Sequence, residues 1–189
     1  MHRSLAVASL LLASATPLHA ATPTLSADVR AFVNFNQPLV AITHVRVIDG
    51  TGAKAKDDQT VVLQDGRIAS VGARGKAPQG AMVIDGTGKT LMPGLVGMHD
   101  HMFYPAPAVN PAAKDALYPE QGSSFPKLYL AGGVTTIRTT GSMEPYTDVA
   151  LKRAIDAGTL VGPKMHTTGP YLEGKGTFAP QLHELADAD

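Results

Sequence analysis

The stretch LMPGLVGMHDHMF, Leu91–Phe103, ends an apolar run with two histidines one residue apart. Neutral imidazoles are costly to bury without partners, and these two stand where a strand should pack Val and Leu. In a strand, residues i and i+2 face the same side, so we expect His99 and His101 to project together. Two imidazoles on one face can hold one metal ion at about 2.0–2.1 Å each. Such a pair can form part of a metal site, with Asp100 facing the opposite way, but a bare H-x-H by itself favours two structural histidines.

The composition limits the function classes. The chain has 189 residues, no Cys, 16 basic and 16 acidic side chains, and a formal net charge of zero. This balance argues against a nucleic-acid surface, which would show a basic excess. Beyond the N-terminal region, no stretch approaches the roughly 18 apolar residues of a membrane span. The length suffices for one core, or for one core and a smaller second one.

The first 20 residues, MHRSLAVASLLLASATPLHA, have a short basic start, an apolar stretch and a small-residue end. This layout is typical of a secretory signal peptide, and a buried N-terminal helix is the alternative. We therefore predict export to the periplasm or secretion, with cleavage after Ala20 or Ala21. A chain without Cys needs no disulfides in an oxidising compartment.

The rest of the chain divides at two changes of pattern. Residues 21–37 have no clear period and are interpreted as a linker. Residues 38–92 alternate apolar and polar side chains, with a hairpin predicted around Asp65-Gly66, a pair that a type I′ turn favours. The segment 81–94 repeats this pattern, with turns at its Asp-Gly and Gly-Lys pairs. Short strands with tight turns indicate a small all-β unit.

After Pro93, strands and helices alternate. The predicted strands are 95–101, 134–141 and 163–169, and the predicted helices are 123–133, 144–158 and one that begins at 180. In the second helix, Leu151 and Ile155 share an apolar face, and Asp148 and Lys152 have the spacing of an ion pair. This alternation predicts an α/β fold with a parallel sheet, whose strands carry their chemistry at the C-terminal ends.

Four motifs in order, VRVIDGTG, LQDGRIASVG, TLMPGLVGMHDH and GVTTIRTTGS, resemble the amidohydrolase superfamily of metal-dependent hydrolases. The most similar branch is imidazolonepropionase-like and Xaa-Pro dipeptidase-like. The resemblance implies a (β/α)8 TIM barrel beside a small composite β-sandwich. It makes His99 and His101 the metal ligands of the first barrel strand, for one or two divalent ions, expected to be Zn²⁺. The chain departs from the pattern at Gly97 and Thr139, where relatives have Asp.

The length predicts only part of this barrel, because a complete one needs about 250 residues. Residues 93–189 hold about three βα units, preceded by the β-sandwich domain at 38–92. The resemblance places a bridging Lys or Glu, two further His and the general-base Asp on later strands. We expect these catalytic groups beyond residue 189. The prediction is a C-terminally truncated fragment that is inactive by itself.

The resemblance implies a hydrolase of carbon–nitrogen bonds with a small-molecule substrate, such as an amide, a cyclic amide or a dipeptide. His166 shares a strand face with Lys164 and Thr168 and is a candidate substrate contact. The sequence does not decide whether the complete enzyme is a homo-oligomer. The alternative is a non-catalytic metal-binding module, although cupins would need a Glu soon after His101 and carbonic anhydrases would be antiparallel.

Overall fold

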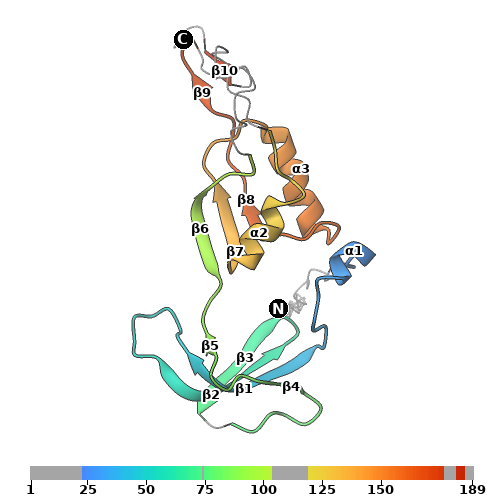
Figure 1. Ribbon diagram of the computed structural model, residues 1–189, viewed down its shortest axis with the longest axis vertical. Helices are drawn as coiled ribbons and strands as arrows, with labels where there is room; N and C mark the ends of the chain where they lie inside the picture. Colours follow the sequence, from blue (N-terminus) through green and yellow to red (C-terminus); the bar gives the residue numbers. More distant parts are fainter. Residues whose placement is uncertain (1–22, 74, 104–118, 177–181, 186–189) are drawn as a thin grey trace, which may run out of the picture.

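The computed structural model describes residues 23–73, 75–103, 119–176 and 182–185. A β-rich sheet and an α/β unit follow one another along the chain, as Figure 1 shows. The predicted signal peptide lies outside the described residues. Among the helices that are described, none has both the length and the apolar character required to cross a membrane.

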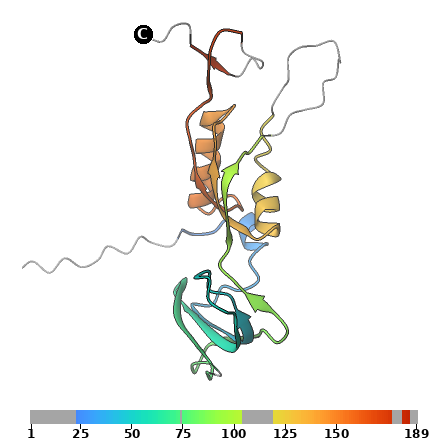
Figure 2. The ribbon, with the colours of Figure 1, turned by 90° about the vertical axis from the view of Figure 1, so that its left-hand side faces the viewer.

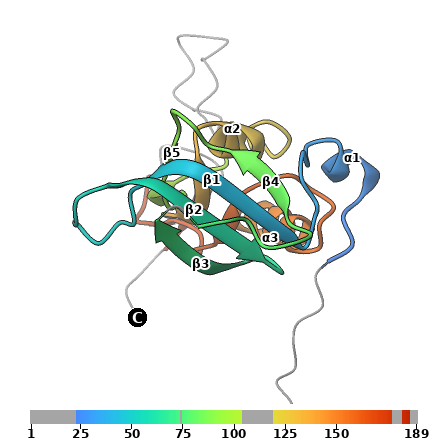
Figure 3. The same cartoon turned by 90° about the horizontal axis from the view of Figure 1, so that it is seen from below.

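The β-rich unit is a single five-stranded sheet. Its strands are β1 (Leu39–Val47), β2 (Lys56–Gln64), β3 (Arg67–Ala73), β4 (Met82–Asp85) and β5 (Thr90–Leu91). The first three are antiparallel neighbours in the order β3-β2-β1, which Figure 3 shows from below. Asp65 and Gly66, between β2 and β3, both have positive φ values, 50° and 73°. The hairpin prediction is therefore confirmed.

The predicted sandwich is not seen as two packed sheets in the described part of the chain. β4 and β5 do not pair with each other; each lies parallel to β1, one after the other along it. The apolar cluster of this sheet contains the buried Val45, Val47 and Val61. On β3, however, Ile68 and Val71 remain 68% and 47% exposed, so one apolar edge of the sheet is uncovered.

The α/β unit follows the predicted strand–helix alternation. It contains β6 (Leu95–Asp100), α2 (Phe125–Ala131), β7 (Val134–Thr139), α3 (Pro145–Asp156) and β8 (Lys164–His166). The three strands are parallel in the order β6-β7-β8 (Figure 1), and Figure 2 shows this unit from the side of β6. Buried Met102, Ile137 and Met165 pack against both helices, through Tyr129 of α2 and Leu151 of α3 among others. The helices therefore cover one face of the sheet, as in a segment of a barrel wall.

Helix α2 begins and ends near the residues expected from its sequence. Ser124 is its N-cap, but its hydroxyl makes no capping hydrogen bond, and its carbonyl accepts from the Leu128 amide at 3.0 Å. Pro126 lies in the first turn, where a missing N–H has no cost. Gly133, with φ of 80°, follows the C-cap and lets the chain turn into β7.

Two local predictions are wrong, and one segment contains a helix that was not predicted. The linker 21–37 contains a one-turn helix, α1 (Ala27–Arg30), because the Ser26 hydroxyl accepts from the Val29 amide and caps it. The expected terminal helix is replaced, at His183–Glu184, by β10, which pairs in parallel with β9 (Leu172–Glu173). This pairing depends on a contact with β9 that the sequence of residues 180–189 does not by itself indicate.

The second error is the predicted ion pair in α3. Asp148 is 1% exposed and does not pair with Lys152, whose ammonium contacts Asp156 instead. The helix turns its apolar face to the sheet, and Asp148 lies three residues before Leu151 on that face. Lys152 lies on the outward side.

Candidate metal site

A β-bulge near the end of β6 determines where the two histidines point. Gly97 pairs with Ile137, whereas Asp100 pairs with Thr139, so three steps on β6 match two steps on β7. Ile137 and Thr139 are both fully buried on the helix side of the sheet. Asp100 therefore faces the helices, and the extra residue brings the histidines to the opposite face.

Neighbouring contacts agree with this orientation. Met102, two residues after Asp100, is fully buried in the cluster under the helices. The Asp100 carboxylate lies next to Gly97, because a Cβ added to that glycine would overlap Oδ2 of Asp100. The expectation that Asp100 faces away from the histidines is confirmed by these contacts. Without the bulge, strict alternation would have placed His99 and His101 under the helices with Gly97.

The two imidazoles are close neighbours. The ring centroids of His99 and His101 are 5.3 Å apart, with the rings nearly perpendicular. His101 also contacts Phe103, with centroids 4.6 Å apart, and lies 6.4 Å from the Tyr171 ring. The His99 side chain is exposed and that of His101 is partly buried. The sequence prediction that both histidines share one side of the strand end therefore agrees with the geometry.

The protonation state of His101 suits metal binding. Burial, and then the neighbouring His99, lower the pKa of the His101 imidazole, while Gly141, Asp100 and Asp148 oppose the shift. A neutral imidazole is the form that ligates a metal. Within the described residues, Nδ1 of His101 is buried and has no hydrogen-bond partner. His101 thus has one buried ring nitrogen without a protein partner, which is compatible with a metal ligand.

The pair supplies only part of a metal site. Among the described residues, no group of three or more His, Cys, Asp or Glu side chains is arranged to hold a metal ion. A catalytic zinc normally has three protein ligands. The two histidines can therefore supply two of these three ligands, and a complete site needs further groups.

Two acidic residues near the histidines were not identified from the sequence. Glu120 follows the segment after β6, and Asp148 is buried on α3. Burial, together with Asp148 and Glu144, raises the pKa of Glu120 to about 7. Burial raises the pKa of Asp148, and the neighbouring Ser142 and His101 oppose this shift. Perturbed carboxyl groups of this kind are often found at functional sites.

A signal for one of the two was available. Asp148 lies three residues before Leu151 and seven before Ile155, which places it on the buried face of α3. No local pattern marks Glu120, because its position depends on long-range contacts such as the backbone bridge with Phe103.

His166 lies on β8, which β7 separates from β6, whereas the histidine pair lies at the end of β6. It pairs with Arg138 across β7 and β8, and both side chains are exposed on the sheet face that the helices leave open. A hollow there is lined by Val96 and Met98 of β6 as well as by Arg138 and His166. His166 therefore shares this surface with β6, which would be the interior wall of a barrel.

Comparisons with known proteins indicate one superfamily. The chain is 29% identical over 137 residues to a dihydroorotase of Anaeromyxobacter dehalogenans (strain 2CP-C), covering 69% of this chain and 29% of that protein. It is 32% identical over 106 residues to an imidazolonepropionase of Stenotrophomonas maltophilia (strain R551-3), covering 54% and 25%. No protein-family model matches the chain.

Solved structures agree with these relatives. A Bifidobacterium longum protein assigned as a prolidase superposes with a TM-score of 0.60 at 30% identity, over 78% of this chain and 34% of that one. A Xaa-Pro dipeptidase with bound methionine superposes with a TM-score of 0.62 at 23% identity, over 73% and 35%, which shows the fold. The chain belongs to the amidohydrolase superfamily and matches the N-terminal part of longer relatives. It spans about a third or less of the length of the relatives described here.

Proposed function

We propose that the chain supplies the first two metal ligands, His99 and His101, of a metal-dependent hydrolase acting on carbon–nitrogen bonds. The observation that carries this proposal is the bulge in β6, which brings both imidazoles to one side of the strand end. The superfamily relationship supports the same assignment. The whole protein's substrate would be an amide, a cyclic amide or a dipeptide, as the names of the relatives suggest.

The chain's own residues would bind and orient the metal, for which Zn²⁺ is the proposed ion. A bound divalent ion supplies a Lewis acid and an activated water. His101, held neutral by burial, and His99 would bind it through ring nitrogens. His166 would contact the substrate from the sheet face that it shares with Arg138. We propose that the general base and the remaining ligands lie outside residues 1–189, so that these residues alone do not hydrolyse substrate.

The direct test is calorimetric titration of the 189-residue chain with Zn²⁺. We expect weak binding that His99→Ala and His101→Ala each reduce strongly, to the residual affinity of a single imidazole, because two imidazoles form the site. His166→Ala is the matched control and should bind like the unchanged chain, since His166 lies away from the pair. Unchanged affinity in both ligand variants would contradict the assignment.

A non-catalytic metal-binding module is the second candidate, because the described residues offer two protein ligands rather than three. The two candidates differ in the product of the complete reading frame that contains this chain. Zinc-dependent hydrolysis of dipeptides or cyclic amides by that product supports the enzyme. Zinc binding without hydrolysis of any of these classes supports the module.

Export is a further part of the proposal and rests on residues 1–20 alone. The basic start, apolar stretch and small-residue end suit a signal peptide. Mass spectrometry of the secreted or periplasmic protein should find an N-terminus at Ala21 or Thr22. Recovery of the exported protein with Met1 intact would contradict it.

A further inference from the structure

The end of β6 is held by three different hydrogen-bond donors. The carbonyl of Asp100 accepts from the Thr140 amide at 3.3 Å, and that of Met102 accepts from the Gln121 amide at 2.6 Å. Between them, the carbonyl of His101 accepts from the hydroxyl of Tyr129 at 3.0 Å. Two of these successive carbonyls are thus held by backbone amides, and the one that belongs to the proposed metal ligand is held by a side chain.

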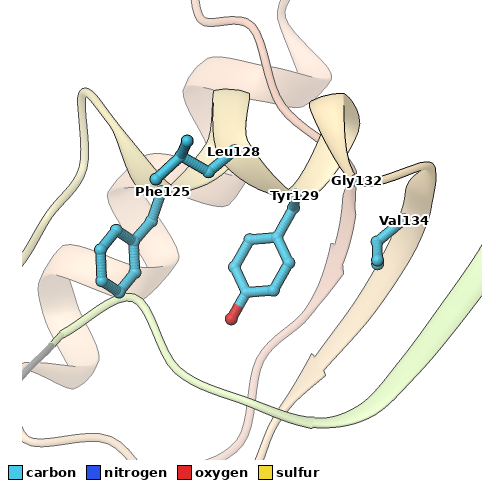
Figure 4. A pocket seen from close by; sticks show the side chains of 5 residues that line it. All are labelled: Phe125, Leu128, Tyr129, Gly132 and Val134. Atoms are coloured by element: carbon cyan, nitrogen blue, oxygen red, sulfur yellow. The ribbon is translucent and has the colours of Figure 1, made fainter.

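Tyr129 is itself well anchored. Its ring projects from α2 beside Phe125 and Val134, and its hydroxyl points away from the helix toward the segment that follows β6 (Figure 4). The ring also packs against the buried cluster of Met102, Ile137 and Met165. A rigid aromatic ring with its hydroxyl at a fixed distance can set the position of the peptide group to which it donates.

The peptide group of His101 determines where its imidazole points. Ladder pairing between β6 and β7 ends at Asp100, so the backbone of His101 lies beyond the last strand pair. The His101 ring contacts His99, Phe103 and the Gly141 backbone, but none of these contacts holds the His101 peptide group. The Tyr129 hydrogen bond therefore holds the His101 peptide group between two neighbouring carbonyls that backbone amides hold.

We propose that Tyr129 is a positioning residue for the metal, acting through the His101 carbonyl to aim the His101 imidazole. This proposal rests on the proposed metal-binding function of the histidine pair. Removal of a group that orients a metal ligand typically weakens metal affinity about 10- to 100-fold. Tyr129 does not touch the metal itself, so its effect should depend on the presence of His101.

The test is Zn²⁺ affinity of the 189-residue chain carrying Tyr129→Phe, which removes the hydroxyl and keeps the ring. We expect the dissociation constant to rise at least about tenfold. Tyr146→Phe is the matched control, because Tyr146 is 90% exposed and should show no change. Equal affinities for Tyr129→Phe and Tyr146→Phe would overturn the proposal.

A second comparison separates positioning from a general loosening of the fold. Tyr129→Phe should still weaken binding when His99 is replaced by Ala, since His101 then carries the residual affinity. It should have no effect when His101 is replaced by Ala. Equal weakening in both backgrounds would mean that the hydroxyl serves stability only and would overturn the proposal.

If Tyr129→Phe does not fold by circular dichroism, two replacements of similar size take its place. Tyr129→para-aminophenylalanine keeps a donor at the ring tip and should retain the affinity, whereas Tyr129→para-methylphenylalanine should lose it. Equal affinity of the two would overturn the proposal. A different result would contradict the proposed function, namely unchanged Zn²⁺ binding in both His99→Ala and His101→Ala.

Discussion

Replacing Glu120 with Gln should stabilise the protein at alkaline pH. Within the described residues, both carboxylate oxygens of Glu120 are buried without a hydrogen-bond partner. Burial, with the nearby Asp148 and Glu144, raises the pKa of Glu120 from its ordinary value of 4.5 to about 7. The folded state therefore holds a proton that the unfolded state has lost between these two pH values.

The sign and size of the effect follow from this raised pKa. The contribution of Glu120 to stability is fully present below pH 4.5 and is lost as the pH rises through about 7. Each unit of this pKa shift changes the free energy of unfolding by about 1.36 kcal/mol, so the effect of Glu120 has an upper limit of about 3 kcal/mol. Because the side chain is only half-buried, water screens part of the effect, and we expect about 1–2 kcal/mol.

The assay is urea unfolding of the unchanged chain and of Glu120→Gln at pH 5 and pH 8, at one protein concentration. We expect the variant to be more stable by about 1–2 kcal/mol at pH 8 and by clearly less at pH 5. Glu184→Gln is the control, since Glu184 is exposed and should show no such pH dependence. A variant that is no more stable than the unchanged chain at pH 8 would refute the reasoning.

Three further predictions follow from packing and backbone geometry. Gly97→Ala should lower the free energy of unfolding by about 1–3 kcal/mol, measured in urea, because its Cβ would overlap Asp100; an unchanged midpoint would contradict the close approach. Gly66→Ala should lower the free energy of unfolding by about 1–2 kcal/mol, because Gly66 has φ of 73°. Gly72→Ala is the control and should lower it by less in the same assay, and equal losses would contradict the argument. Val96 and Met98 are 58% and 61% exposed on one sheet face. Replacing both with Thr should reduce self-association measured by sedimentation velocity. Undiminished association would show that this face does not mediate the self-association.

The elements that could be predicted from the sequence are those set by local chemistry. The Asp65-Gly66 hairpin forms because its turn needs two positive φ values, which this pair tolerates. The alternation of β6, α2, β7, α3 and β8 follows from apolar periodicity that changes at Pro93 and at the glycines after each helix. The shared side of the histidine pair was expected from its i, i+2 spacing, whereas the role of metal ligand came from the resemblance of the surrounding motifs.

The remaining features depend on contacts between distant segments. The bulge in β6 is a matter of register against β7, and the spacing of H-x-H by itself does not say which face the pair occupies. The parallel pairing of β4 and β5 with β1 was missed because Asp-Gly and Gly-Lys pairs suggest hairpins whatever the partner strand is. The Asp148–Lys152 error arose from spacing alone, without regard to which face of α3 is buried.

The central claim is that His99 and His101 together bind a metal ion. X-ray absorption at the zinc edge of the zinc-loaded chain counts the imidazole ligands directly. The account predicts two imidazoles at about 2.0–2.1 Å, and one in His101→Ala. Zinc without imidazole scattering, or two imidazoles that persist in both His99→Ala and His101→Ala, would contradict it.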